Sequence, residues 1–157
     1  MRKEGLRIFL DSNVIISGLF SDRGAPAILL DLLSLGLPVL CGATGEFNIV
    51  EIERNLKKKM PEVLSKYHEY LPLLKLEIIP VPSAREIRDI EGHVADKDLP
   101  VLASAIKAKA DFLVTGDKKD FGKAKAGRSG SYSFKIVSPA ELLHTLLPEI
   151  LRLLKAE

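Results

Sequence analysis

The fold is decided by the stretch DFLVTGDKKDFG, residues 111–122, in which an apolar run ends in small and acidic residues. This run is typical of a buried β-strand, because strands covered on both faces are short, apolar and bounded by turn residues. A second stretch, LRIFLDSN at residues 6–13, has the same form. One acid follows each predicted strand: Asp117 in the first stretch and Asp11 in the second.

Three more strands are predicted, at 38–42, 76–80 and 135–137, and predicted helices separate the strands. Apolar residues recur at helical spacing from Val14 onward, and again over 25–36, 46–59, 83–92, 99–110 and 140–157. Strands that alternate with helices favour a parallel sheet covered on both faces. We therefore expect an α/β fold in which about five parallel strands lie between two layers of helices.

Capping residues mark several of the predicted helix ends. Ser83 is followed by Glu86, and Ser138 by Glu141, which is the spacing of a capping box. Thr44 stands just before the long helix at 46–59, where its hydroxyl could accept a backbone hydrogen bond. We expect Thr44 to be the cap of that helix.

The composition fits one globular domain over residues 1–157, with the last predicted helix at its C-terminal end. The chain is 46% hydrophobic and 28% charged, and its formal net charge is +2. No apolar stretch reaches the roughly 20 residues of a membrane span, and the first residues are too polar for a secretory signal. The single cysteine, Cys41, excludes an internal disulfide. We expect a cytoplasmic protein that does not enter the membrane.

Positive charge is concentrated in two places. Lys57, Lys58 and Lys59 are consecutive, and a second basic stretch covers residues 118–128. Lysine runs usually form solvated surface, but they also contact phosphates where the substrate is a polyanion. Whether these lysines contact phosphate depends on whether the acidic residues form a site for a polyanionic substrate.

The acids that follow the strands are candidates for a shared site. In open parallel sheets, ligands bind beyond the carboxyl ends of the strands, where the strand order reverses. Asp11 and Asp117 converge there if their two strands are neighbours. Asp98 precedes the helix at 99–110, where it could cap the helix or stand at its tip beside them. Asp96 lies two residues earlier.

The helix at 46–59 supplies a further acid. Glu51 and Glu53 lie on different faces of it, so that one of them is expected to face the sheet edge. Several carboxylates in one place repel one another, and a divalent cation compensates that charge. Ligation by oxygen alone suits Mg²⁺ or Mn²⁺, which can activate water for hydrolysis of a phosphodiester.

Four segments in order resemble the PIN (PilT N-terminal) domain family: DSNVIISGL at 11–19, IVEIERNL at 49–56, DLPVLASA at 98–105 and VTGDKKDF at 114–121. The resemblance covers roughly residues 6–140. It implies a Rossmann-like three-layer sandwich around a parallel sheet. It also implies metal-dependent ribonuclease activity, which many members have, including toxins of toxin-antitoxin pairs.

The same resemblance implies roles for individual residues. The catalytic, metal-binding acids are Asp11, Glu51, Asp98 and Asp117. Asp120 is an auxiliary metal ligand, and the supporting residues are Ser12, Asn13, Thr115 and Asp96. Glu53 remains an alternative to Glu51, and Asp96 can replace or supplement Asp98.

The leading hypothesis is an endoribonuclease that depends on Mg²⁺ or Mn²⁺ and whose partners are RNA, an antitoxin protein and a second copy of the chain. One alternative is an inactive PIN-fold module that binds RNA or protein. Another is phosphoryl transfer to Asp11, but the phosphatases that use it have a second Asp where this chain has Asn13. The stretch at 123–133 is longer than the matching loop of minimal members, and no role is assigned to it.

Overall fold

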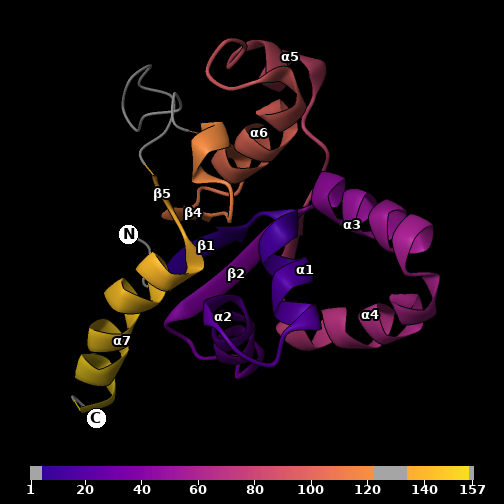
Figure 1. Ribbon diagram of the computed structural model, residues 1–157. Helices are drawn as coiled ribbons and strands as arrows, with labels where there is room; N and C mark the ends of the chain where they lie inside the picture. The colour runs from indigo at the N-terminus through magenta and orange to yellow at the C-terminus, as the bar shows by residue number, and fades with distance from the viewer. Residues whose placement is uncertain (1–4, 122–133, 156–157) are drawn as a thin grey trace.

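A computed structural model describes residues 5–121 and 134–155 of the chain (Figure 1). Its five strands form one sheet, and all neighbouring strands are parallel. The strands are β1 (Leu6–Leu10), β2 (Leu40–Gly45), β3 (Glu77–Ile79), β4 (Phe112–Val114) and β5 (Lys135–Val137). Their order across the sheet is β3-β2-β1-β4-β5. The predicted α/β fold with five parallel strands is confirmed.

Seven α-helices lie in the described part of the chain, and they cover both faces of the sheet (Figure 1). They are α1 (Ser12–Phe20), α2 (Ala25–Ser34), α3 (Glu46–Lys59), α4 (Leu64–Tyr70), α5 (Ala84–Arg88), α6 (Leu99–Lys107) and α7 (Pro139–Lys155). In Figure 1, α5 and α6 lie on one side of the sheet and α1, α2 and α7 on the other. No helix in these residues is both long enough and apolar enough to span a bilayer.

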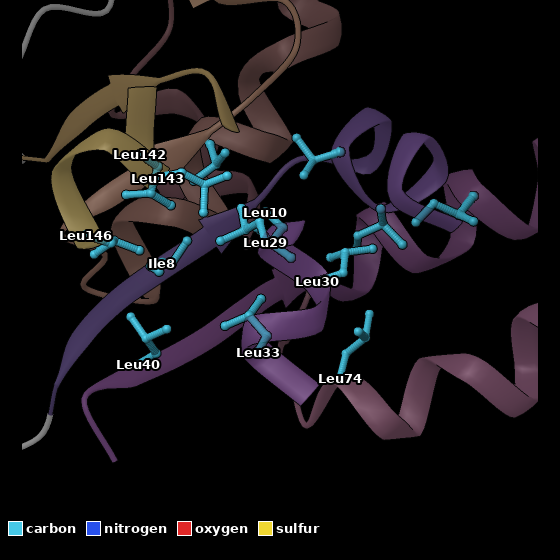
Figure 2. Close-up of a cluster of buried hydrophobic side chains, with 14 of the residues drawn as sticks. Ile8, Leu10, Leu29, Leu30, Leu33, Leu40, Leu74, Leu142, Leu143 and Leu146 are labelled. Atoms are coloured by element: carbon cyan, nitrogen blue, oxygen red, sulfur yellow. The ribbon is translucent and has the colours of Figure 1, made fainter. Parts of the chain in front are cut away.

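Alternation along the central strand β1 builds two cores. Ile8 and Leu10 belong to a cluster with buried residues of α1, α2, α3 and α7, and Figure 2 shows part of it, with Leu29 and Leu142 among the labelled side chains. Phe9 points to the opposite face and packs with residues of α6. Because successive strand residues face opposite sides, one apolar strand is buried in both cores. This gives the molecule its three layers.

The strand order reverses at β1, which lies between β2 and β4. Leu10 is aligned with Val114 in the parallel ladder between β1 and β4. The next residue, Asp11, continues the pairing, because its backbone N–H donates to Val114 O at 2.9 Å. The strands that precede Asp11 and Asp117, β1 and β4, are therefore neighbours, which is the condition that the sequence analysis set.

The capping boxes are as predicted. Ser83 and Glu86 exchange hydrogen bonds between side chain and backbone, and Ser138 and Glu141 do the same at the start of α7. The prediction for Thr44 is wrong. Thr44 lies inside β2, where its Oγ1 donates to Leu10 O at 2.8 Å, and α3 begins at Glu46.

Pairing between strands explains the shift of β2. It was predicted at 38–42 but is Leu40–Gly45, because its second half pairs with β3, with Thr44 opposite Ile78. The helix predicted at 83–92 is also shorter: α5 ends at Arg88 and is followed by turns. The lysine-bearing stretch at 123–133 lies outside the described residues.

Candidate active site

A cavity of about 230 Å³ opens at the carboxyl ends of β1 and β4. Four separate parts of the chain supply its walls: the start of α1, one face of α3, the segment that enters α6, and the turn after β4. The lining residues are Asp11, Ser12, Asn13, Ile16, Glu51, Asn55, Lys97, Asp98, Val101, Asp117 and Asp120. The four acids predicted to be catalytic thus line one cavity, together with Asp120.

Asp11 is the most buried of these acids, with 9% of the residue exposed. It is the N-cap of α1: Oδ1 accepts a 2.7 Å hydrogen bond from the backbone N–H of Ser12. Oδ2 accepts a 2.9 Å bond from Thr115 Oγ1. The pKa of Asp11 is raised to about 6, chiefly by burial and also by Glu51 and Asp98, although the two hydrogen bonds lower it.

Asn48 connects Asp11 to the helix acid. Its Nδ2 lies 2.9 Å from Ser12 Oγ and 3.4 Å from Asp11 Oδ1, and its Oδ1 accepts from the backbone N–H of Gly45. Ser12 Oγ in turn donates a 2.6 Å bond to Glu51 Oε1. Asn48 is completely buried, so these bonds satisfy an amide that has no access to water. Glu51 is thereby tied to the side of the cavity where Asp11 lies.

Glu53, the alternative to Glu51, lies elsewhere. Its Oε1 is 3.7 Å from His68 Nε2 on α4, and it is not among the residues that line the cavity. The structure brings Glu51, and not Glu53, to the other acids.

Asp117 is positioned by the turn that follows β4. Its Oδ2 accepts a 3.0 Å bond from Asn13 Nδ2, and its backbone N–H donates to Thr115 Oγ1 at the same distance. Asn13 Oδ1 also accepts from the backbone N–H of Gly116. The side chains of three small polar residues, Ser12, Asn13 and Thr115, therefore bond to Glu51, Asp117 and Asp11.

Asp98 ends a short 3₁₀ turn, Asp96–Asp98, that leads into α6. It occupies the N-cap position of α6, but its side chain makes no capping hydrogen bond there. Its Oδ2 is buried and has no hydrogen-bond partner among the described residues. Desolvation raises the pKa of Asp98, and Lys97 opposes this rise. Asp96 is exposed and does not line the cavity.

Asp120 belongs to a 3₁₀ turn, Lys118–Phe121, and its backbone N–H donates to Asp117 O. Its Oδ2 lies 3.6 Å from Lys97 Nζ. Lys118, from the same turn, points to α7, where its Nζ lies 2.8 and 3.0 Å from the two carboxylate oxygens of Glu141. Lys118 and Lys97, both near the site, therefore have different partners.

The donor set suits a hard divalent cation, because the acids supply only oxygen. The unpaired Oδ2 of Asp98 and the raised pKa of Asp11 mark carboxylates whose charge the protein compensates only in part. Within residues 5–121 and 134–155, however, no three His, Cys, Asp or Glu side chains are grouped closely enough to hold a metal ion. Glu51, Asp117 and Asp120 instead bond to Ser12, Asn13 and Lys97.

Three polar residues were missed by the sequence analysis: Asn55 and Lys97, which line the cavity, and Asn48, which is buried and bonds to Asp11 and Ser12. The spacing of Asn48, Glu51 and Asn55, three and four residues apart, places all three on one face of α3 and was a usable signal. Lys97 gave no such signal, because a lysine between two aspartates is typical of a solvated turn.

Comparisons with known proteins agree with this fold. A family model described as PIN domain matches residues 7–119. A comparison with curated proteins gave no significant match. Among solved structures, VapBC2 from Rickettsia felis, bound to a DNA fragment from their promoter, matches with a TM-score of 0.58 and 21% identity, over 83% of this chain and 98% of that one.

Two further structures are similar. DNA-bound VapBC from Salmonella typhimurium has a TM-score of 0.58 and 15% identity, and covers 85% of this chain and 98% of its own. PAE2754 from Pyrobaculum aerophilum has a TM-score of 0.55 and 15% identity, and covers 92% of both chains. At these identities the structural matches establish a shared fold.

Proposed function

The chain belongs to the PIN domain family, and from this premise we propose that it is an endoribonuclease that depends on Mg²⁺ or Mn²⁺. The observation that carries the proposal is the cavity. Acids from four separated segments, Asp11, Glu51, Asp98 and Asp117, line it at the point where the strand order reverses. The site is the one at which parallel sheets bind ligands.

The cation would be held by Asp11, Glu51, Asp98 and Asp117. Asp120 lines the same cavity and would be an auxiliary ligand. When bound, a divalent cation lowers the pKa of water and stabilises the charge that develops on phosphate oxygens. The fit rests on the oxygen-only donors and on the buried, unpaired Oδ2 of Asp98. Among the described residues no three such side chains are now grouped for a metal, so the acids would have to move closer together when the cation binds.

The chain's own polar residues orient these acids. Thr115 Oγ1 donates to one carboxylate oxygen of Asp11. The same hydroxyl accepts from the backbone N–H of Asp117 and so fixes the start of the turn that bears this acid. Ser12 and Asn13 hold Glu51 and Asp117. Such bonds limit the rotation of a carboxylate, and so they prepare its direction before substrate arrives.

The proposed partners are RNA, an antitoxin protein and a second copy of this chain. Two of the similar solved structures are VapBC proteins bound to DNA, and together with the resemblance to toxins of toxin-antitoxin pairs they support an antitoxin partner. For the homodimer, α7 offers Leu147 and Leu151, which are 45% and 56% exposed. Large exposed apolar side chains on one helix are typical of a protein interface.

The test is cleavage of single-stranded RNA by the wild-type protein with Mg²⁺ or Mn²⁺ and with EDTA. We expect cleavage with the metals, none with EDTA, and none by an Asp11→Asn variant. Asp22→Asn is the matched control, because Asp22 is exposed and lies outside the cavity. Equal cleavage by the Asp11 variant would refute the proposal, and metal binding without cleavage of any RNA would favour the inactive binding module.

A further inference from the structure

The cavity has an electrostatic conflict with the substrate proposed above. Five of its lining residues are acids, and an RNA phosphate is also negative. Like charges in a partly enclosed site repel strongly, because solvent screens them less there than in bulk water. Binding of RNA is helped by a positive side chain at the cavity, whether or not a cation is present.

Among the described residues that line the cavity, Lys97 carries the only positive charge. It is the middle residue of the turn Asp96–Asp98, directly before the acid whose Oδ2 has no partner. Its side chain is 72% exposed. The ammonium group is therefore beside the acids but still accessible to a ligand that enters from solvent.

Lys97 forms a weak, exposed ion pair with Asp120, which a phosphate oxygen can replace. Lys97 Nζ lies 3.6 Å from Asp120 Oδ2, and both side chains are substantially exposed. Exposed pairs of this type contribute little to stability, so that a phosphate oxygen can replace the carboxylate without a large loss. The contact keeps the lysine at the cavity in the free protein.

The other lysine near the site is less suited to this role. Lys118 lies within 3.0 Å of both oxygens of Glu141, which also belongs to the capping box of α7. Hydrogen bonds from Lys118 and Ser138 lower the pKa of Glu141 to about 2, so this carboxylate stays ionised and holds Lys118. Lys118 does not line the cavity.

We propose that Lys97 contacts a backbone phosphate of the RNA substrate in the cavity and exchanges Asp120 for it when RNA binds. This inference rests on the proposed function. It assigns a phosphate contact to a lysine outside the basic runs at 57–59 and 118–128, which the sequence analysis considered for that role.

The test measures binding of a short fluorescein-labelled single-stranded RNA by anisotropy, in EDTA, over a range of KCl concentrations. For Lys97→Gln we expect an affinity roughly tenfold below wild type at low salt. The slope of log affinity against log salt should be shallower by about 0.7, because one phosphate contact is lost. Lys97→Arg should bind within about twofold of wild type, because it keeps the charge.

Lys107→Gln is the matched control. Lys107 lies at the other end of α6 and has a comparable exposed ion pair, with Glu86 at 3.4 Å, but it is outside the cavity. Its variant should bind RNA as wild type does. Thermal unfolding of all variants separates a binding effect from loss of folded protein.

The outcomes separate the two proposals. If wild type cleaves RNA with Mn²⁺ and Lys97→Gln binds with the affinity and salt slope of Lys107→Gln, the inference about Lys97 is wrong and the ribonuclease proposal stands. If wild type neither binds nor cleaves RNA, both fail. In steady-state cleavage with Mn²⁺, the expected effect of Lys97→Gln is a raised KM at nearly unchanged kcat, and the reverse pattern contradicts a contact that serves binding.

Discussion

Thr115 Oγ1 donates a 2.9 Å hydrogen bond to Asp11 Oδ2 and so joins the residues that follow β4 and β1. The same hydroxyl accepts from the backbone N–H of Asp117. Thr115 is completely buried and Asp11 is 9% exposed, so this bond has little access to water. One side chain thus sets the position of two of the acids that we propose to bind the metal.

The first prediction concerns the stability of the metal-free protein. The pKa of Asp11 is raised from 3.8 to about 6 in the folded state, so this state binds the proton more tightly than the unfolded chain does. The contribution of Asp11 to the free energy of unfolding should therefore be largest below pH 4. This contribution should fall as the pH rises from about 4 to about 6. Asp11→Asn removes this loss.

Urea unfolding in EDTA measures the effect. Two pKa units correspond to about 3 kcal/mol, so the difference between Asp11→Asn and wild type should shift by about 2 to 3 kcal/mol in favour of the variant between pH 4 and pH 7. Asp22→Asn should show no such shift. Parallel curves for wild type and the Asp11 variant over this range would show that burial of this carboxylate has no cost.

The second prediction separates the two helix acids. Glu51 lines the cavity and bonds to Ser12, whereas Glu53 faces His68. Glu51→Gln should lower RNA cleavage by on the order of 100-fold or more, since loss of a residue that only supports a metal ligand already costs 10- to 100-fold. Glu53→Gln should stay within about twofold of wild type. A larger loss from Glu53→Gln would mean that α3 presents a different face to the substrate.

The third prediction separates Asp98 from Asp96. Asp98 has a buried, unpaired carboxylate oxygen at the cavity, and Asp96 is exposed outside it. Asp98→Asn should weaken the affinity for Mn²⁺, measured by isothermal titration calorimetry, by roughly tenfold or more. Asp96→Asn should leave it nearly unchanged. If the two variants bind Mn²⁺ equally well, Asp98 is not a ligand.

The fourth prediction concerns Gly45, which is close to the side chain of Asn48. A Cβ at Gly45 would lie 2.8 Å from Asn48 Oδ1 and 3.0 Å from Ser104 Oγ, and both neighbours are completely buried. Gly45→Ala should lower the free energy of unfolding by about 1 to 3 kcal/mol, because the buried Asn48 must move. At Gly116 the nearest atom, Asn13 Oδ1, is 3.4 Å away, so Gly116→Ala should cost less. If denaturant unfolding shows equal losses of stability for Gly45→Ala and Gly116→Ala, Asn48 moves aside at no cost.

Much of the fold could be predicted because its signals are local. Five apolar runs became the five strands, and the long helix at 46–59 has the predicted limits. The convergence of Asp11 and Asp117 was predicted only on condition that their strands are neighbours, and the observed strand order meets that condition. Thr44 shows where local signals stop: its position before a helix favoured a cap, but pairing with β3 extended β2 through it.

The site was predictable in its acids but not in all its polar partners. Asp11 and Asp117 stand at strand ends, and Glu51 could have been preferred over Glu53 because Asn48 and Asn55 share its helix face. The network around Asn48 joins residues that are far apart in the chain, such as Asp11, and no local pattern contains such bonds. To predict that Lys97 lines the cavity, one would need the direction of a single exposed side chain. That direction is set by the turn at 96–98, and composition does not give it.

The most direct test of the metal site is a crystal of the wild-type protein soaked in Mn²⁺ and measured for anomalous scattering. The predicted result is Mn²⁺ in the cavity, bonded to carboxylate oxygens of Asp11 and Asp117, with those of Glu51 or Asp98 in its coordination sphere directly or through water. An empty cavity at saturating Mn²⁺, or Mn²⁺ bound only elsewhere on the protein, would contradict the proposal that these acids form a metal-dependent nuclease site.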